Sequence, residues 1–217
     1  MNIVPIKPAY LSPEELYYSL QTMAILEIIM LPPEAAWLRL VKKHPSRKAY
    51  FIDDVSGNIV DIWFEAIGVF IKGFDHENEW NQFAADKWDE TFFQKTYQDI
   101  PKQFFENYKD DKEKLYEMTF CMWYDAKENC WKQNANLEKN TDYEERDGGK
   151  DFLLSYIYTS AEEWIDWANY YYKKNFDLKV VKKIYDGQTI TTQDIAALNP
   201  ERDTKEAFKE ILALKNS

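Results

Sequence analysis

Asp75, His76 and Glu77 are three adjacent residues whose side chains are suited to acid–base or metal chemistry. Carboxylates and imidazoles carry protons and bind metal ions, so one hypothesis is a metal-assisted hydrolase that uses all three. In an extended strand, however, neighbouring side chains point to opposite faces, so His76 would point away from the two acids. We therefore expect His76 to form hydrogen bonds at the end of a strand, and we expect no metal or other cofactor.

A second chemical hypothesis is acid–base catalysis by paired carboxylates. Asp61 and Glu65 share one face of a predicted strand, and a paired strand would bring Asp75 and Glu77 close to them. The chain has 38 acidic residues, so chance clusters form easily, and we expect these charges on the solvent face of a sheet. No GxSxG, P-loop or GxGxxG motif is present. We therefore expect a binding protein rather than an enzyme.

The stretch from residue 75 to residue 90 combines six acidic residues and two tryptophans with a single lysine. Aromatic anchors give binding energy at protein interfaces, and complementary charge speeds association. The predicted binding residues are Asp75, Glu77, Glu79, Trp80, Trp88, Asp89 and Glu90. We expect an acidic surface with exposed aromatic groups that binds another protein, and a basic toxin is the candidate partner.

The composition agrees with this interpretation and disfavours others. The chain has 217 residues, a formal net charge of −11, and 13 Phe, 8 Trp and 15 Tyr. Nucleic acids and anionic membranes require a basic surface, so we expect neither as a partner. The first residues show no basic segment followed by a long apolar core, so we expect no secretory signal and a cytoplasmic location. The most apolar run, residues 23–31, contains Glu27 and is too short to span a bilayer.

Helix signals lie toward both ends of the chain. Ser12-Pro13-Glu14-Glu15 is a typical helix start, and apolar residues follow at helical spacing until Pro32-Pro33. Toward the other end, Ser160 and Asp203 are expected to cap amphipathic helices, and residues 192–198 predict a short helix between them.

The middle of the chain is typical of antiparallel strands. The β-branched and aromatic runs AYFIDD, NIVDIWFEA and IGVFIKGF predict a meander, and LYEMTFCMWY with NCWKQ predicts a second hairpin. Residues 134–149 are polar, lack an apolar period and end in two glycines, which predicts a loop. We expect one α+β domain over residues 1–217, with a sheet-containing portion at 1–133 and a helical portion at 150–217 joined by this loop.

Three segments, GVFIKGFDHE, TFCMW and IYDGQTITTQDIAALNP, resemble in this order a group of bacterial proteins with no assigned biochemistry. The shared motifs are KGFDHE, TFC-x-W and LNP, and the resemblance extends from about Trp37 to Pro200. It implies a bacterial source and carries over no catalytic residue. The acidic, aromatic-rich profile is also similar to immunity proteins of bacterial toxin systems, which implies an acidic inhibitor of a basic toxin.

Overall fold

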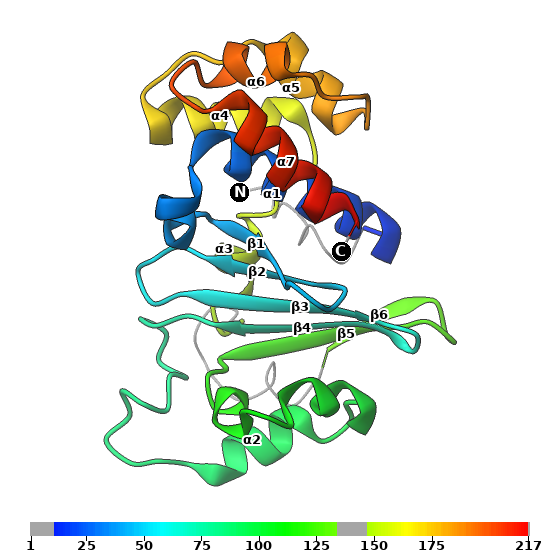
Figure 1. Cartoon of the computed structure of the whole chain (residues 1–217). Helices are drawn as coiled ribbons and strands as arrows, with labels where there is room; N and C mark the ends of the chain where they lie inside the picture. Colours follow the sequence, from blue (N-terminus) through cyan, green and yellow to red (C-terminus); the bar gives the residue numbers. More distant parts are fainter. Residues whose placement is uncertain (1–10, 134–146, 217) are drawn as a thin grey trace, which may run out of the picture. The chain divides into compact units, whose positions relative to one another are not determined.

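The computed structural model describes residues 11–133 and 147–216, which form two compact units (Figure 1). Of these residues, unit 1 takes 11–13, 48–133 and 147–156, and unit 2 takes 14–47 and 157–216. The predicted α+β class is confirmed. The sequence predicted a sheet-containing portion and a helical portion joined by the loop at residues 134–149. The two units of the structure are divided differently, because the N-terminal helix belongs with the C-terminal helices. Residues 134–146 of the predicted loop lie outside the described residues.

Unit 1 is built on an antiparallel sheet in which each strand pairs with the next one along the chain. The predicted meander and second hairpin are both present. The strands are β2 (Ala49–Asp53), β3 (Ile59–Glu65), β4 (Gly68–Phe74), β5 (Phe120–Asp125) and β6 (Cys130–Gln133). The register places Asp61 opposite Lys72, and Phe70 opposite Trp123.

Helical segments cover one face of this sheet (Figure 1). They are α2 (Glu90–Tyr97) and two 3₁₀ helices, η3 (Lys102–Tyr108) and η4 (Lys112–Leu115). Phe104 stacks on Phe70 of β4 with ring centroids 5.4 Å apart, and Trp63 of β3 donates a hydrogen bond to the Tyr108 hydroxyl. Asp61 and Trp63 of β3, which face these segments, are consequently buried. The expectation that Asp61 lies on a solvent face is therefore wrong, because aromatic side chains from η3 pack over that face.

The helix α3 (Lys150–Leu154) also belongs to unit 1, whereas unit 2 is mainly helical. Its elements are α1 (Pro13–Met30), η2 (Pro33–Leu38), β1 (Val41–Lys43), α4 (Ala161–Tyr172), α5 (Leu178–Tyr185), α6 (Thr192–Leu198) and α7 (Thr204–Asn216). Two predicted caps are confirmed: Ser160 accepts from the Glu163 amide, and Asp203 accepts from the amides at the start of α7.

The helix α1 is buried around its whole circumference over residues 23–30. The carbonyl groups at its C-terminal end have no partner within the helix and need external donors. Arg202 donates to Ile28, Asn199 donates to Ile29 and Met30, and Arg39 donates to Leu31. The three contacts from Asn199 and Arg202, which are distant in sequence, explain why α1 shares a unit with the C-terminal helices. In the described part of the chain, no helix is both long and apolar enough to cross a membrane.

Candidate functional site

The three residues of the Asp75-His76-Glu77 motif form a turn immediately after β4. Asp75 Oδ1 accepts a hydrogen bond from the Glu77 amide at 3.1 Å, and its carbonyl accepts from Asn78 at 3.1 Å. The His76 amide donates to Asn58 Oδ1 at 2.8 Å. The His76 ring is exposed, and its Nδ1 lies 2.8 Å from Glu77 Oε1. The motif therefore directs its hydrogen bonds to the turn and to the end of the sheet.

These side chains do not form a metal site in this arrangement. Across residues 11–133 and 147–216, no group of three or more His, Cys, Asp or Glu side chains is placed to hold a metal ion. The His76–Glu77 pair is 55% and 88% exposed, and such a surface pair contributes little stability. The metal-assisted hydrolase that uses Asp75, His76 and Glu77 stays a hypothesis, and the geometry adds no support to it.

The turn begins a loop, residues 75–90, that we call the acidic aromatic loop. Side-chain oxygens of Asp75, Asn78, Asn81 and Asp89 each accept a hydrogen bond from the amide two residues further along the chain. Asn and Asp favour such turns because their short side chains reach the nearby backbone. Gln82 adds a longer bridge, since its Oε1 accepts from the Asp89 amide at 2.9 Å. The loop is therefore folded on itself by a series of local hydrogen bonds.

Two glycines fix the first residue of the loop to the core of unit 1. The buried Thr119 hydroxyl accepts from the Asp75 amide at 3.0 Å and donates to the Gly148 carbonyl at 2.6 Å. Gly148 has φ +70°, and a Cβ there would lie 2.2 Å from the Thr119 carbonyl oxygen. At Gly149 a Cβ would lie 2.2 Å from an Asp75 carboxylate oxygen. Close approach of the Thr119 backbone to Gly148, and of the Asp75 side chain to Gly149, therefore favours glycine at both positions.

The two predicted tryptophan anchors have different environments. Trp80 is half-buried, and its ring lies 6.2 Å from that of Phe92 and closely approaches Gly148. Trp88 is 40% exposed and contacts the rings of Phe83, Phe93 and Tyr116 at 5.2–5.6 Å. Trp80 thus attaches the loop to unit 1, whereas Trp88 presents part of its indole ring to solvent.

Phe83 is a further member of this surface that the sequence interpretation missed. It is 59% exposed and makes an edge contact with Trp88, with ring centroids 5.6 Å apart. Its position in NQFAADKW, among polar and acidic residues with no apolar period, is the signal that would have identified it. Phe83 and Trp88 together form an aromatic pair on the outside of the loop.

The predicted acidic residues surround this pair in sequence and are mostly exposed. Glu77, Glu79, Asp89 and Glu90 are exposed, and Asp75 is half-buried. The Thr91 hydroxyl and amide both donate to Asp89, which holds the pKa of that carboxyl below its ordinary value. Glu90 accepts a hydrogen bond from the Trp88 indole at 3.0 Å. The loop therefore carries exposed acidic side chains next to exposed aromatic rings.

A buried carboxylate, Glu27, lies in unit 2 within the most apolar run of the sequence. Glu27 is 2% exposed, and it accepts hydrogen bonds from the Leu40 amide at 2.8 Å and the Tyr172 hydroxyl at 3.4 Å. Burial raises the pKa of Glu27 to about 7, against the opposing effect of these hydrogen bonds. Glu27 thus joins α1 to the chain just before β1.

Comparison with known proteins adds no relative to this description. No protein-family model, curated protein or solved structure matches the chain. The candidate site therefore rests on its own geometry.

Proposed function

We propose that this chain is a cytoplasmic bacterial protein that binds another protein through the acidic aromatic loop, and that the partner is a basic toxin which it inhibits. One observation carries the proposal. The loop exposes 59% of Phe83 and 40% of Trp88, in contact with each other, within a segment of six carboxylates and one lysine. Exposed rings of this size next to charged groups are typical of binding surfaces.

The charge of the loop favours a basic partner. Residues 75–90 carry a net negative charge, and the whole chain has a formal charge of −11. A group of negatively charged carboxylates attracts a basic protein over a distance of about 10 Å at moderate salt, and it accelerates the association of that protein. Once the partner is in place, Trp88 and Phe83 supply apolar area for it to cover.

The internal hydrogen bonds of the loop support the same function. A loop that becomes ordered only on binding loses conformational entropy, which weakens the complex. Here the turns at Asp75, Asn78, Asn81 and Asp89 hold the backbone before any partner arrives. The aromatic pair is therefore presented in a fixed position, as a tight inhibitor requires.

The proposal is tested by affinity capture from a native lysate with three baits. They are the unaltered chain, a Phe83→Ser/Trp88→Ser variant of the loop, and a control variant, Trp37→Ser/Tyr170→Ser. The control removes two other exposed aromatic residues, 62% and 87% exposed, from unit 2. We expect the unaltered bait and the control bait to retain a basic protein that the loop variant does not retain. Moderate salt should release this protein from both baits.

The toxin part of the proposal has its own test, which is growth of cells that express the captured protein. Co-expression of the unaltered chain should restore growth, and co-expression of the loop variant should not. Identical captured proteins on all three baits would refute the binding surface. A captured protein that does not inhibit growth would refute inhibition of a toxin while leaving the binding surface in place.

A further inference from the structure

The acidic aromatic loop holds Trp88 between other rings while leaving part of its indole open. Phe93, which is 3% exposed, lies against Trp88 with ring centroids 5.2 Å apart and ring planes inclined by 31°. Phe83 and Tyr116 make edge contacts with the indole at 5.6 Å and 5.4 Å. Trp88 nevertheless stays 40% exposed. A ring that is already fixed loses little conformational entropy when another group stacks on it.

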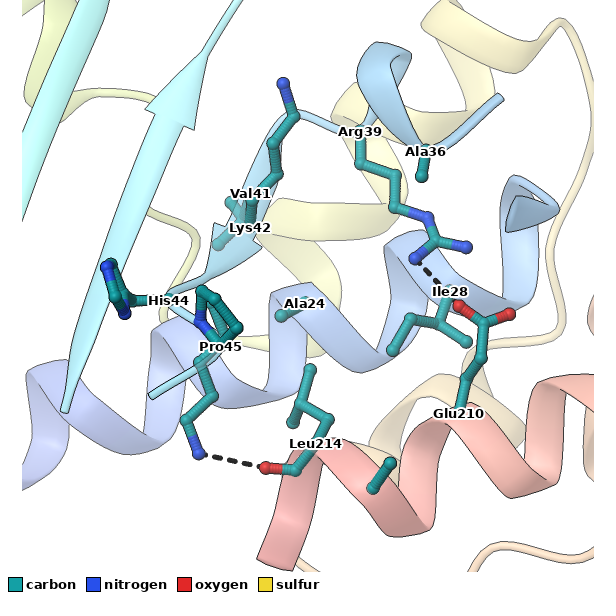
Figure 2. Close-up of a pocket in the computed structure, with 12 residues that line it drawn as sticks. Ala24, Ile28, Ala36, Arg39, Val41, Lys42, His44, Pro45, Glu210 and Leu214 are labelled. Atoms are coloured by element: carbon teal, nitrogen blue, oxygen red, sulfur yellow. Dashed lines mark hydrogen bonds and ion pairs between the residues drawn. The ribbon is translucent and has the colours of Figure 1, made fainter. Parts of the chain in front are cut away.

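A carboxylate lies at the edge of this indole. The Trp88 indole N–H donates to Glu90 Oε2 at 3.0 Å, and both side chains are exposed. The donor is neutral, so it does not balance the charge of the carboxylate. In unit 2, by contrast, Arg39 pairs with Glu210 at 3.0 Å beside an apolar groove (Figure 2). Among the described residues, neither Glu90 nor Asp86 pairs with a lysine or an arginine.

An exposed indole beside a carboxylate favours a cation as its ligand. The face of a tryptophan ring attracts cations more strongly than the face of any other side chain, and a carboxylate adds an ion pair. No lysine or arginine of the described residues lies over the Trp88 ring, whereas Lys72 lies 5.4 Å from the centre of the Tyr108 ring. The cation that Trp88 and Glu90 favour therefore comes from another molecule.

We propose that Trp88 and Glu90 together bind an arginine side chain of the partner. The guanidinium group stacks on the open part of the indole and donates hydrogen bonds to the Glu90 carboxylate. Arginine fits this pair better than lysine, because its planar group stacks on aromatic rings and its fork of N–H donors matches a carboxylate. This inference rests on the proposed function, since it names the contact that a basic partner makes at the loop.

The test is an NMR titration of the full chain with N-acetylarginine amide, N-acetyllysine amide and N-acetylcitrulline amide at equal ionic strength. Citrulline has nearly the shape of arginine but carries no charge. The reporter is the Trp88 indole N–H signal, because that group donates to Glu90. The arginine compound should bind about threefold more tightly than the lysine compound and about tenfold more tightly than the citrulline compound.

Two variants of the loop separate a specific contact from general negative charge. Glu90→Gln removes the charge and keeps an acceptor for the indole, so it should weaken arginine binding by about threefold and leave citrulline binding unchanged. Asp86→Asn removes another exposed carboxylate of the same loop, one that has no hydrogen bond to Trp88, and should leave arginine binding nearly unchanged.

Three results would overturn the proposal. They are a Trp88 signal that does not respond to arginine, equal binding of arginine with lysine or citrulline, and equal losses in Glu90→Gln and Asp86→Asn. Each of these results would leave the captured basic protein and its dependence on the loop in place, because affinity capture does not report which side chain makes the contact. Failure of the capture, in turn, would refute the proposed function without changing the order of the three small compounds.

Discussion

Asp61 and Lys72 lie opposite each other on β3 and β4, and Lys72 Nζ is 3.0 Å from Asp61 Oδ2. Their side chains are only 8% and 2% exposed. The Tyr108 hydroxyl donates a second hydrogen bond to Asp61, and Lys72 also donates to the carbonyls of Lys114 and Glu117. The pair therefore links two strands to the helical segments that cover them.

Removal of one partner from this pair should strongly destabilise unit 1. We expect Lys72→Met to lower the free energy of unfolding by about 3–5 kcal/mol, because the Asp61 charge is left buried without its counter-ion. The double variant Lys72→Met/Asp61→Leu should lose less free energy of unfolding than the sum of the losses in the single variants Lys72→Met and Asp61→Leu. Chemical denaturation of all four proteins measures this coupling. Additive losses would show that the two charges do not stabilise each other.

Glu27 should make the stability of unit 2 depend on pH. Its folded pKa of about 7 exceeds the ordinary value of 4.5, so the protonated form is favoured in the folded state. The contribution of protonated Glu27 to the free energy of unfolding is complete below pH 4.5 and is lost as the pH rises through 7. Glu27→Gln mimics the protonated form and keeps an acceptor for the Leu40 amide. The free energy of unfolding of this variant should exceed that of the unaltered chain by up to about 3 kcal/mol at pH 8.5, and the two values should be equal near pH 4.

Denaturation of both proteins across this pH range checks the prediction. The difference between the two curves isolates Glu27, since every other titrating group is common to both proteins. A difference that stays constant from pH 4 to pH 8.5 would contradict the proposed burial of an ionisable carboxyl at this position.

Gly148 should tolerate no side chain, because of its contact with Thr119. A Cβ there would lie 2.2 Å from a backbone oxygen, so Gly148→Ala should cost about 3 kcal/mol or more. Gly187 offers a matched control with a similar φ of +68° and nothing within 4 Å of an added Cβ. Gly187→Ala should cost only the left-handed backbone penalty, about 1–2 kcal/mol. Equal thermal shifts for the two variants would rule out the close contact.

The hydrolase hypothesis predicts stabilisation by a metal ion, and the present account does not. Chelator-stripped protein should show the same melting temperature with and without Zn²⁺, Mn²⁺, Mg²⁺ or Ca²⁺. A bound ion at 100 times its dissociation constant would add about 2.7 kcal/mol, which is readily seen. A shift that disappears in an Asp75→Asn/His76→Ala variant would restore the metal-assisted hydrolase as the leading function.

Local signals in the sequence were sufficient for most individual elements. Ser160 and Asp203 identified helix starts because a capping side chain bonds amides two or three residues away. The strands of unit 1 were visible as short β-branched and aromatic runs between turns. Burial of Asp61 was not predictable in this way, because it depends on η3 returning over the sheet from 47 residues away.

The grouping of α1 with the C-terminal helices was also not predictable from local signals in the sequence. It depends on contacts such as Asn199 with Ile29, which are 170 residues apart in sequence. In the candidate site, the acidic residues were easily identified because charge and composition are local properties. The different roles of Trp80 and Trp88 were not, since each depends on which rings lie nearby.

The most direct test of the account is the affinity of the captured partner for Trp88→Ala and Trp37→Ala variants. Both remove an exposed indole, but only Trp88 lies in the acidic aromatic loop. We expect Trp88→Ala to weaken binding by about 30-fold, as for a hot-spot residue with a loss of about 2 kcal/mol. Trp37→Ala should bind as the unaltered chain does. Equal affinities for the two variants would contradict the assignment of this loop as the binding surface.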